Sequence, residues 1–442
     1  MDSVSIRPAA KASRTGSPTS ERDDGWFRCS AFMFQMGLAL VTFEEVRPLG
    51  IMLSDYCFLL SLIFLPKSRL LRLKGSGVLL AGTLILMAAL LSLHDAPSLG
   101  DAAGSLLRLF LLFGLIAPLS LSHSKDIHRN LFFLAGGIFV NCLITVLQAS
   151  IFPDIVDLLA INPPQPDVAF QGRAQGLTEF PVTLGLSAAL AVLIGIGLFS
   201  MEKSRLVRWG LAVLILVCSI AALLSGSRTF LASLIPGLLV FSFLQKKRRR
   251  SVVYACVGLM VLWGAVTYVA PAVVSQYSER LDNVGLVDYG RLATAAQIAL
   301  EIYEKPILGW GVDHFDGGGI VVVPETGEIA PAHNTFLRYW YAAGLLGAIG
   351  FLTLFVIPTR NMLQVIRIKT SDKSAEVVRL LLASYVFFFI VANLGPYLYS
   401  RYLYVPMFVF AGFVAHATGP IRAQKFNPRS IMRLPAQNGA VS

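Results

Sequence analysis

Charged residues are scarce in this chain of 442 residues: they make up 14% of it, whereas 55% of the residues are hydrophobic. A typical soluble protein has about 25% charged residues. A soluble fold of this length could not keep so much apolar surface away from water. The composition therefore predicts an integral membrane protein whose main solvent is lipid.

Several motifs that would indicate metal, nucleotide or disulfide chemistry are also missing. The five cysteines form no C-x-x-C pair, which excludes a zinc ribbon and argues against a disulfide framework; small apolar packing residues are the simpler interpretation. The six histidines form no H-E-x-x-H motif, and there is neither a D-x-D pair nor a Walker loop. We therefore expect no metal, no cofactor and no primary pump.

Long apolar runs recur along the chain and are typical of membrane-spanning helices, because each segment in lipid must satisfy its own backbone hydrogen bonds. Short alternating segments, the pattern of a β-barrel, are not what the sequence has. The predicted fold is all-α and polytopic, with about twelve spans. They lie near 26–43, 49–66, 76–93, 104–120, 130–152, 181–200, 209–224, 229–244, 252–271, 334–357, 379–395 and 402–418.

Basic residues outnumber acidic ones, 37 to 26, and their distribution predicts the topology. With both termini in the cytoplasm, 28 of the basic residues fall in inner segments, as the positive-inside rule requires. The excess of positive charge is thus explained without nucleic acid as a partner. The nine that remain on the outer side are Arg47, Arg108, Arg173, Arg228, Arg280, Arg291, Lys305, Arg338 and Arg401.

This topology divides the chain into three parts. Residues 1–25 form a polar cytoplasmic tail that we expect to be disordered, residues 26–418 the transmembrane core, and residues 419–442 a second cytoplasmic tail. Two outer loops are long, at about 153–180 and 272–333, and such loops often carry function. The larger loop has a net charge of −6 and a predicted helix over 291–303, with Leu292, Ala295, Ile298, Ala299 and Ile302 on one face.

Three of the outer arginines are candidate anion ligands, since a guanidinium stays charged and matches phosphate oxygens in pairs. Arg228 lies in a tight hairpin between two spans, where a snorkelling interface arginine is the alternative. Arg291 is predicted to open the loop helix, a position unfavourable for the helix dipole, so a ligand or a salt bridge with Asp288 is expected. Arg173 lies similarly just before a span.

His333 lies where the larger loop meets the next span. Histidine can accept a proton near neutral pH and suits a general base, although a single interface histidine can equally be structural. Asp55 and the Glu44–Glu45 pair, near outer helix ends, could couple ions in a transporter; packing two helices together is the simpler interpretation.

The residues around His333 resemble a known family. His333 and Asn334 are followed by nine residues and then by Gly344, two leucines and Gly347. This order is similar, at every fixed position, to the signature H-[NSQ]-x9-G-x2-[GTY] of the O-antigen ligase superfamily of bacterial envelope enzymes.

Further segments resemble the same family over about 170–350, and the twelve-span layout agrees along the whole chain. Arg291 precedes the run KPILGWG, which resembles the family's Arg…Pro-x-x-Gly-x-Gly run with Pro306, Gly309 and Gly311. Arg228 matches the family's hairpin arginine. The stretch GRAQGLTEFP, with Arg173 and Gly176, is similar to the segment before the family's central helices.

The resemblance implies a metal-independent glycosyltransferase of the bacterial inner membrane with its active face in the periplasm. Such enzymes move a glycan from undecaprenyl pyrophosphate onto an acceptor hydroxyl, such as that of a glycan or lipid A-core, with inversion. Arg228, Arg291 and Arg173 would bind the pyrophosphate and His333 would act as the catalytic base. Asn334, Gly309, Gly311, Gly344 and Gly347 would shape the site. The lipid bilayer and polysaccharide assembly or export machinery are further expected partners.

Two alternatives remain open at the level of sequence. The same family contains polymerases, whose acceptor is another lipid-linked repeat unit and whose product is O-antigen, capsule or exopolysaccharide; the histidine signature favours the ligase. A polysaccharide flippase or other transporter would suit twelve helices equally well. Transporters, however, tend to show repeats or interrupted helices at the midplane, and no internal repeat is visible here.

Overall fold

The computed structural model describes residues 18–48, 51–66, 77–96, 98–160, 173–245, 284–312, 333–368, 373–395, 397 and 399–426. Every regular element in this part of the chain is helical. The elements are α1 (Pro18–Ala39), α2 (Leu53–Ile63), α4 (Val78–Leu91), η2 (Ser92–Asp95), α5 (Leu99–Leu109), η3 (Phe110–Ile116), α6 (Ala117–His123), α7 (Ile127–Ser150), α8 (Ile155–Leu159), α9 (Pro181–Met201), α10 (Arg205–Leu224), α11 (Thr229–Leu244), α14 (Val284–Glu304), α15 (Thr335–Ile368), α16 (Lys373–Leu394) and α17 (Arg401–Phe426).

Seven helical stretches among the described residues are long and apolar enough to cross a membrane. They are Val78–Asp95, Leu99–His123, Ile127–Ser150, Pro181–Met201, Arg205–Leu224, Thr335–Ile368 and Ser374–Leu394. The all-helical membrane fold predicted from the sequence is therefore confirmed. Of the other predicted spans, four overlap α1, α2, α11 and α17, and the span at 252–271 lies outside the described residues. A total of twelve spans stays a prediction.

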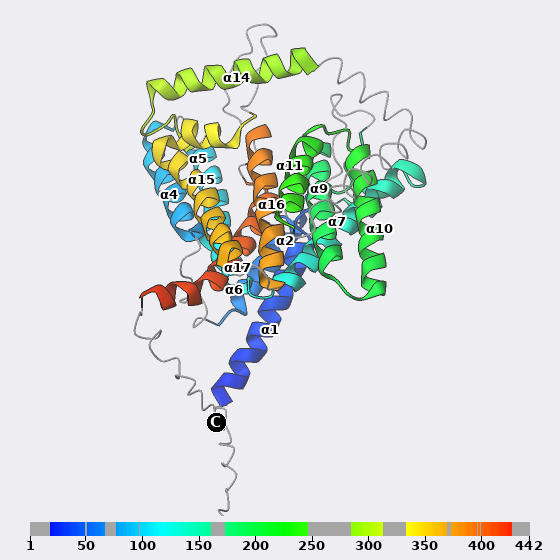
Figure 1. The fold of residues 1–442 in the computed structure, drawn as a ribbon. Coiled ribbons are helices and arrows are strands. Elements are labelled where there is room, and N and C mark those ends of the chain that lie inside the picture. Colours follow the sequence, from blue (N-terminus) through cyan, green and yellow to red (C-terminus); the bar gives the residue numbers. More distant parts are fainter. Residues whose placement is uncertain are drawn as a thin grey trace, which may run out of the picture.

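The bundle has two distinct ends (Figure 1). We call the end crossed by α14 the loop end, and the opposite end, where α1 begins and α17 ends, the tail end. The start of α1 and the end of α17 thus lie at one end of the bundle, as the predicted topology requires. Which side of a membrane each end faces stays a prediction.

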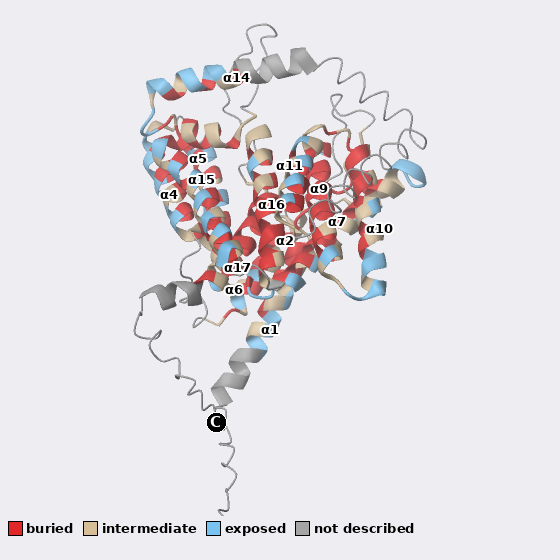
Figure 2. Cartoon of the chain, viewed as in Figure 1, coloured by how far each residue is buried: buried red, intermediate tan, exposed pale blue. Residues whose placement is uncertain are grey.

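Helix α9 lies at the centre of one half of the bundle and is apolar on all sides, as a fully enclosed helix must be. It packs against α7, α10, α11 and α16, and nearly all its residues from Thr183 to Leu198 are buried (Figure 2). Gly197 lets α16 approach closely, because a Cβ there would lie 2.5 Å from the Leu380 methyl groups.

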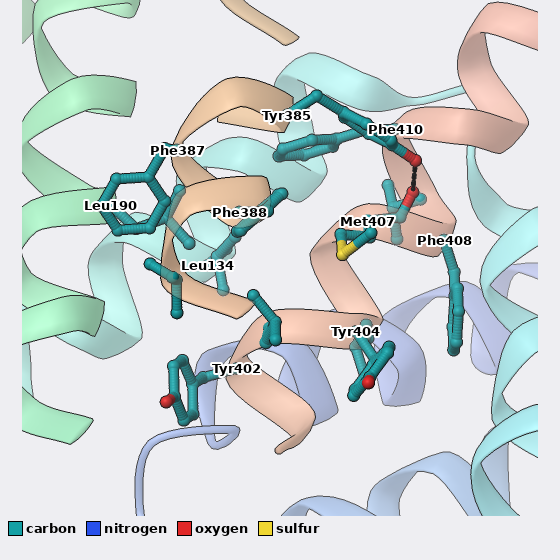
Figure 3. Close-up of a cluster of buried hydrophobic side chains, with 14 of the residues drawn as sticks. Leu134, Leu190, Tyr385, Phe387, Phe388, Tyr402, Tyr404, Met407, Phe408 and Phe410 are labelled. Atoms are coloured by element: carbon teal, nitrogen blue, oxygen red, sulfur yellow. Dashed lines mark hydrogen bonds between the residues drawn. The ribbon is translucent and has the colours of Figure 1, made fainter. Parts of the chain in front are cut away.

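Aromatic side chains fix how α15, α16 and α17 sit against one another. The Tyr385 hydroxyl on α16 donates a hydrogen bond of 2.9 Å to the Met407 carbonyl on α17 (Figure 3). Tyr404 on α17 meets Tyr339 on α15, with 3.4 Å between the two hydroxyl oxygens. Phe388 of α16 and Phe410 of α17 also pack together, at 5.9 Å between ring centroids. These contacts hold α17 against both α15 and α16.

Helix α15 is not the continuous span predicted over 334–357, because it breaks at Gly344 (φ 65°, ψ −166°). At 1.5 Å per residue its 34 residues would extend about 50 Å, well beyond a hydrocarbon core of about 30 Å. Residues 335–343, which we call the short segment, lie across the loop end, whereas residues 345–368, the spanning segment, run down the bundle (Figure 1). The break places the start of α15 at the loop end.

Candidate active site at the loop end

The two glycine motifs of the sequence meet at the break in α15. The chain that leaves α14, residues 305–312, which we call the glycine loop, pairs with the backbone on both sides of Gly344. The Trp310 amide donates to the Tyr341 carbonyl at 2.8 Å, and the Gly311 amide donates to the Ala342 carbonyl at 3.1 Å. Beyond the break, the Leu345 amide donates to the Pro306 carbonyl at 2.9 Å. The glycine loop thus forms hydrogen bonds with backbone amide and carbonyl groups of α15 that lack helical partners because the helix is interrupted.

Glycine is required at this junction for steric reasons. The φ and ψ of Gly344 fall in a region that only glycine adopts readily, and a Cβ there would collide with the Ile307 carbonyl. A Cβ on Gly309 would lie 2.6 Å from the Gly344 nitrogen and 2.7 Å from the Ala342 oxygen. Gly347 lies one turn further on, where a Cβ would be 2.8 Å from the Tyr339 carbonyl oxygen. The structure therefore brings Gly309, Gly311, Gly344 and Gly347 together.

His333 is held at the start of the short segment by its neighbours. Asn334 caps the helix, since its Oδ1 accepts from the Leu337 amide at 3.0 Å, and its Nδ2 donates to Asn393 at the end of α16 at 3.2 Å. The Thr335 hydroxyl donates to the Gly395 carbonyl at 2.6 Å. His333 itself is half-buried. The polar residues after the histidine thus fix its backbone to the loop end of α16.

Arg173 packs against the hairpin of α10 and α11 that carries Arg228, and we call these two the hairpin arginines. Arg228 occupies the position directly before α11, after the short turn from α10, so it lies in a hairpin between two helices as the sequence predicted. Arg173 lies against that turn, with its Nε donating to the Ser225 carbonyl at 2.8 Å, and the Ala174 amide donates to the Leu224 carbonyl at 3.2 Å. Both arginines are half-buried.

The hairpin and the histidine lie at the same end of neighbouring helices. Helix α11 packs along α16, and Gly237 of α11 faces Ala383 and Phe387 of α16. Because the two helices run in opposite directions, following them toward the loop end brings Arg228 level with the end of α16, where Asn334 is anchored.

The expectation for Arg291 was wrong in one respect. Helix α14 begins at Val284 and continues through Gly290, so Arg291 lies inside the helix and does not open it. A glycine inside a helix costs about 1 kcal/mol, which did not stop the helix here. The helix dipole therefore gives no reason to expect a ligand at Arg291. The side chain of Arg291 lies outside the described residues.

The apolar face predicted for this helix is confirmed in its second half. Ile298 and Ile302 are buried against Tyr341 of the short segment, whereas Ala299 is exposed. The Trp310 indole donates to the Glu301 carbonyl at 2.9 Å, and the Trp340 indole donates to the Pro306 carbonyl at 3.1 Å. Helix α14, the glycine loop and the short segment thus form one packed unit over the loop end.

A cavity of about 650 Å³, which the sequence did not predict, lies at the loop end. Four arginines and three carboxylates line it, together with apolar residues of α2, α5, η3 and α6. The arginines are Arg47, Arg108, Arg338 and Arg401, and the carboxylates are Glu44, Asp55 and Glu179. All four arginines were among the nine basic residues expected on the outer side, but no motif separated them from the other five.

Ion pairs hold two of these arginines in place. Arg401 on α17 forms a bidentate ion pair with Asp55 on α2. Its Nε donates to Oδ1 at 3.2 Å and its Nη2 donates to Oδ2 at 3.0 Å. Arg47 pairs with Glu179 at 2.7 Å. Asp55 therefore joins two helices, in agreement with its interpretation as a packing residue.

Glu44 is buried beside the second pair. Its carboxylate accepts from the Glu179 amide at 3.1 Å. Burial raises the pKa of Glu44 to about 7, because the charged form is poorly solvated there. With four arginines against three carboxylates, the cavity is net positive at neutral pH.

The fold and site define a multi-pass helical membrane protein. One end of its bundle has a histidine, several arginines, and a junction of glycines where the glycine loop pairs with α15 at Gly344. Residues 211–352, about a third of the chain, match the family model described as O-antigen ligase. This match supports membership of the O-antigen ligase superfamily, and the family points to a glycosyltransferase-like enzyme. The matched region includes Arg228, Arg291, His333 and the four glycines, but not Arg173. No curated protein matches the chain.

Proposed function

We propose that this protein transfers a glycan from undecaprenyl pyrophosphate to an acceptor hydroxyl at the periplasmic face of the bacterial inner membrane. The observation that carries the proposal is the anchoring of His333. Its segment is tied to α16 by Asn334 and to the glycine loop by the contacts at Gly344. A histidine whose flanking backbone is fixed in this way, at the same end as the hairpin arginines, would suit the role of a base in group transfer to a bound acceptor.

The reaction needs positive charge where the leaving group departs. As the acceptor oxygen bonds to the anomeric carbon, the bond from that carbon to the pyrophosphate oxygen breaks, and its electron pair leaves with undecaprenyl pyrophosphate. Arg228 on the hairpin, Arg173 against it and Arg291 of α14 would neutralise this charge without a metal ion. Fixed cations in a site of low dielectric stabilise such charge without reorganisation.

His333 would accept the proton that the acceptor hydroxyl loses as it attacks. An attacking oxygen on the face opposite the leaving group gives inversion at the anomeric carbon. Neutral imidazole is the form of histidine that can accept this proton.

The test is transfer by the purified protein with a lipid-linked oligosaccharide and an acceptor. We expect His333→Ala and Arg291→Ala each to lower the rate at least 100-fold, the usual order for loss of a general base or of a fixed charge. His94→Ala is the matched control, because His94 is an exposed histidine at the loop end, in η2. Wild-type rates in both His333→Ala and Arg291→Ala would show that these roles are wrongly assigned.

The family supports a ligase or a polymerase, and the acceptor decides between them. Deletion of the gene separates the two activities by its envelope phenotype. For a ligase, lipid A-core is left bare while polymer still accumulates on the carrier. For a polymerase, polymer length is lost.

A further inference from the structure

The cavity at the loop end has a charged part built from four separate stretches of chain. Arg47 follows α1, Arg108 lies on α5, Arg338 on the short segment and Arg401 at the start of α17. Arg338 and Arg401 are each only 7% exposed, although burying a guanidinium is costly. The carboxylates that line the cavity are fewer than its arginines, so the cavity favours an anion.

The other part of the cavity is apolar and continues onto the outside of the bundle. Leu62, Leu111 and Leu115 line its wall. Leu59 and Leu107 also line it and remain 38% and 58% exposed on α2 and α5. In a membrane protein such side chains face lipid. A single molecule that fits both parts has an anionic head and a long apolar tail.

The cavity lies next to the short segment, which His333 precedes, and the hairpin arginines do not line it. Arg338 is on the same short segment that His333 precedes. Tyr399 and Arg401 follow Tyr397, whose amide donates to the Thr335 hydroxyl at 3.0 Å. Arg173 and Arg228 do not line the cavity, whereas Glu179, at the end of the Arg173 stretch, does.

We propose that this cavity binds the phosphate-bearing head of a second lipid, the lipid-borne acceptor, with its tail along the α2 and α5 leucines. The inference rests on the proposed function, in which the hairpin arginines hold the donor. A transferase whose two substrates are both anchored in the membrane needs two sites for lipid phosphate. Among the described residues, the loop end has the hairpin arginines and the arginines of the cavity, and the short segment, which His333 precedes, borders the cavity. An arginine guanidinium can donate two parallel hydrogen bonds to phosphate oxygens, and the leucine side chains can pack against a prenyl or acyl chain.

Binding of undecaprenyl phosphate to the purified protein tests the cavity directly. The measurement is made in an Arg228→Gln background, which weakens the donor site, with undecaprenol and inorganic phosphate as separate probes. We expect Arg108→Gln to weaken binding of undecaprenyl phosphate at least ten-fold. Arg108 is exposed at its position, so its replacement should not disturb folding. Arg208→Gln, an exposed arginine at the tail end on α10, is the matched control and should leave binding unchanged.

The outcomes separate the sources of the ligand. Tight binding of undecaprenyl phosphate with weak binding of both undecaprenol and inorganic phosphate supports the proposal. Equal binding of undecaprenol, or full competition by inorganic phosphate, overturns it, as does wild-type binding by Arg108→Gln.

Kinetics distinguish a failure here from a failure of the proposed function. In the transfer assay, Arg108→Gln should raise the KM for the lipid-borne acceptor and leave that for the donor unchanged, and Arg228→Gln should do the reverse. A protein that shows the binding pattern but transfers no glycan would contradict the proposed function and leave the lipid site standing. Transfer with no change in the acceptor KM of Arg108→Gln would contradict the lipid site alone.

Discussion

Gly344 has a backbone conformation that no other residue adopts at low cost, and it carries the contact between the short segment and the glycine loop. Its neighbour across that contact, Gly309, is equally enclosed by backbone atoms. The spacing of the histidine signature therefore has a mechanical reason. The nine residues between Asn334 and Gly344 form the short segment, and the glycine marks the position where the chain must turn into the bundle.

We expect Gly344→Ala to lower glycan transfer more than ten-fold with His333 intact. Strain of about 1–3 kcal/mol at such a position, together with the clash at Ile307, would detach the glycine loop. Transfer rate and protease cleavage in the 305–312 stretch are the measurements. Gly210→Ala is the control, because a Cβ there meets no atom within 4 Å. Full transfer by Gly344→Ala would show that the junction does not support the site.

Glu44 predicts a dependence of stability on pH. Its pKa is about 7 in the folded protein and 4.5 in a solvated chain, because burial penalises the charged form. The folded state therefore binds the proton more tightly. This stabilisation is complete below about pH 4.5 and is lost as the pH rises through about 7.

The unfolding temperature in detergent should therefore fall from about pH 5 to about pH 8, and fall less in Glu44→Gln. Glutamine can still accept from the Glu179 amide. Part of the slope should persist in Glu44→Gln, because burial also raises the pKa of Glu45. An identical pH profile for wild type and Glu44→Gln would contradict the burial of this carboxyl group.

At the scale of helices, the ion pair between Asp55 and Arg401 joins α2 to α17, although the two residues are 346 positions apart in the sequence. Breaking a buried pair by removing one partner costs about 3–5 kcal/mol, because the other charge stays buried. We expect Asp55→Ala to lower the apparent melting temperature clearly, and Asp55→Ala with Arg401→Met to recover much of the loss. Asp157→Ala, on the exposed face of α8, should change it little. A small effect of Asp55→Ala would mean that the pair is solvated.

The sequence predicted that the helices exist better than it predicted where they begin and where they break. Hydropathy located the runs, because lipid selects for average apolarity over about twenty residues. It gave no sign of the break at Gly344, since both sides of the break are apolar. It started α14 too late, at Arg291, because Gly290 resembled a helix boundary. The π-helical turn of η3 along the cavity wall likewise leaves the apolar pattern unchanged.

At the candidate site, residues with a motif could be predicted and those without one could not. His333 and the glycines belong to motifs with fixed spacings, and Arg228 lies in a short hairpin between two apolar runs. Arg47, Arg108, Arg338 and Arg401 come from four distant stretches, and only the packing of the helices brings them to one cavity.

For the whole molecule, the distribution of basic residues predicts that the tail end faces the cytoplasm. We test this with single cysteines in a background without the five native ones. Ala299→Cys, exposed on α14, should react with a membrane-impermeant maleimide on intact spheroplasts. Ser204→Cys, exposed between α9 and α10, should react only after lysis. The reverse pattern would invert the topology and exclude a periplasmic site.

Because α15 is broken, the position of the site along the membrane normal can be independent of the thickness of the bilayer. Membrane-spanning helices respond to a thicker or thinner hydrocarbon core by changing their tilt. A change of tilt in the spanning segment would begin beyond Leu345, which the glycine loop holds, while the short segment stays fixed to α14, α16 and the glycine loop. His333 therefore keeps its height relative to the loop end when the tilt changes. Membranes of different lipid composition would then present the same site to their substrates.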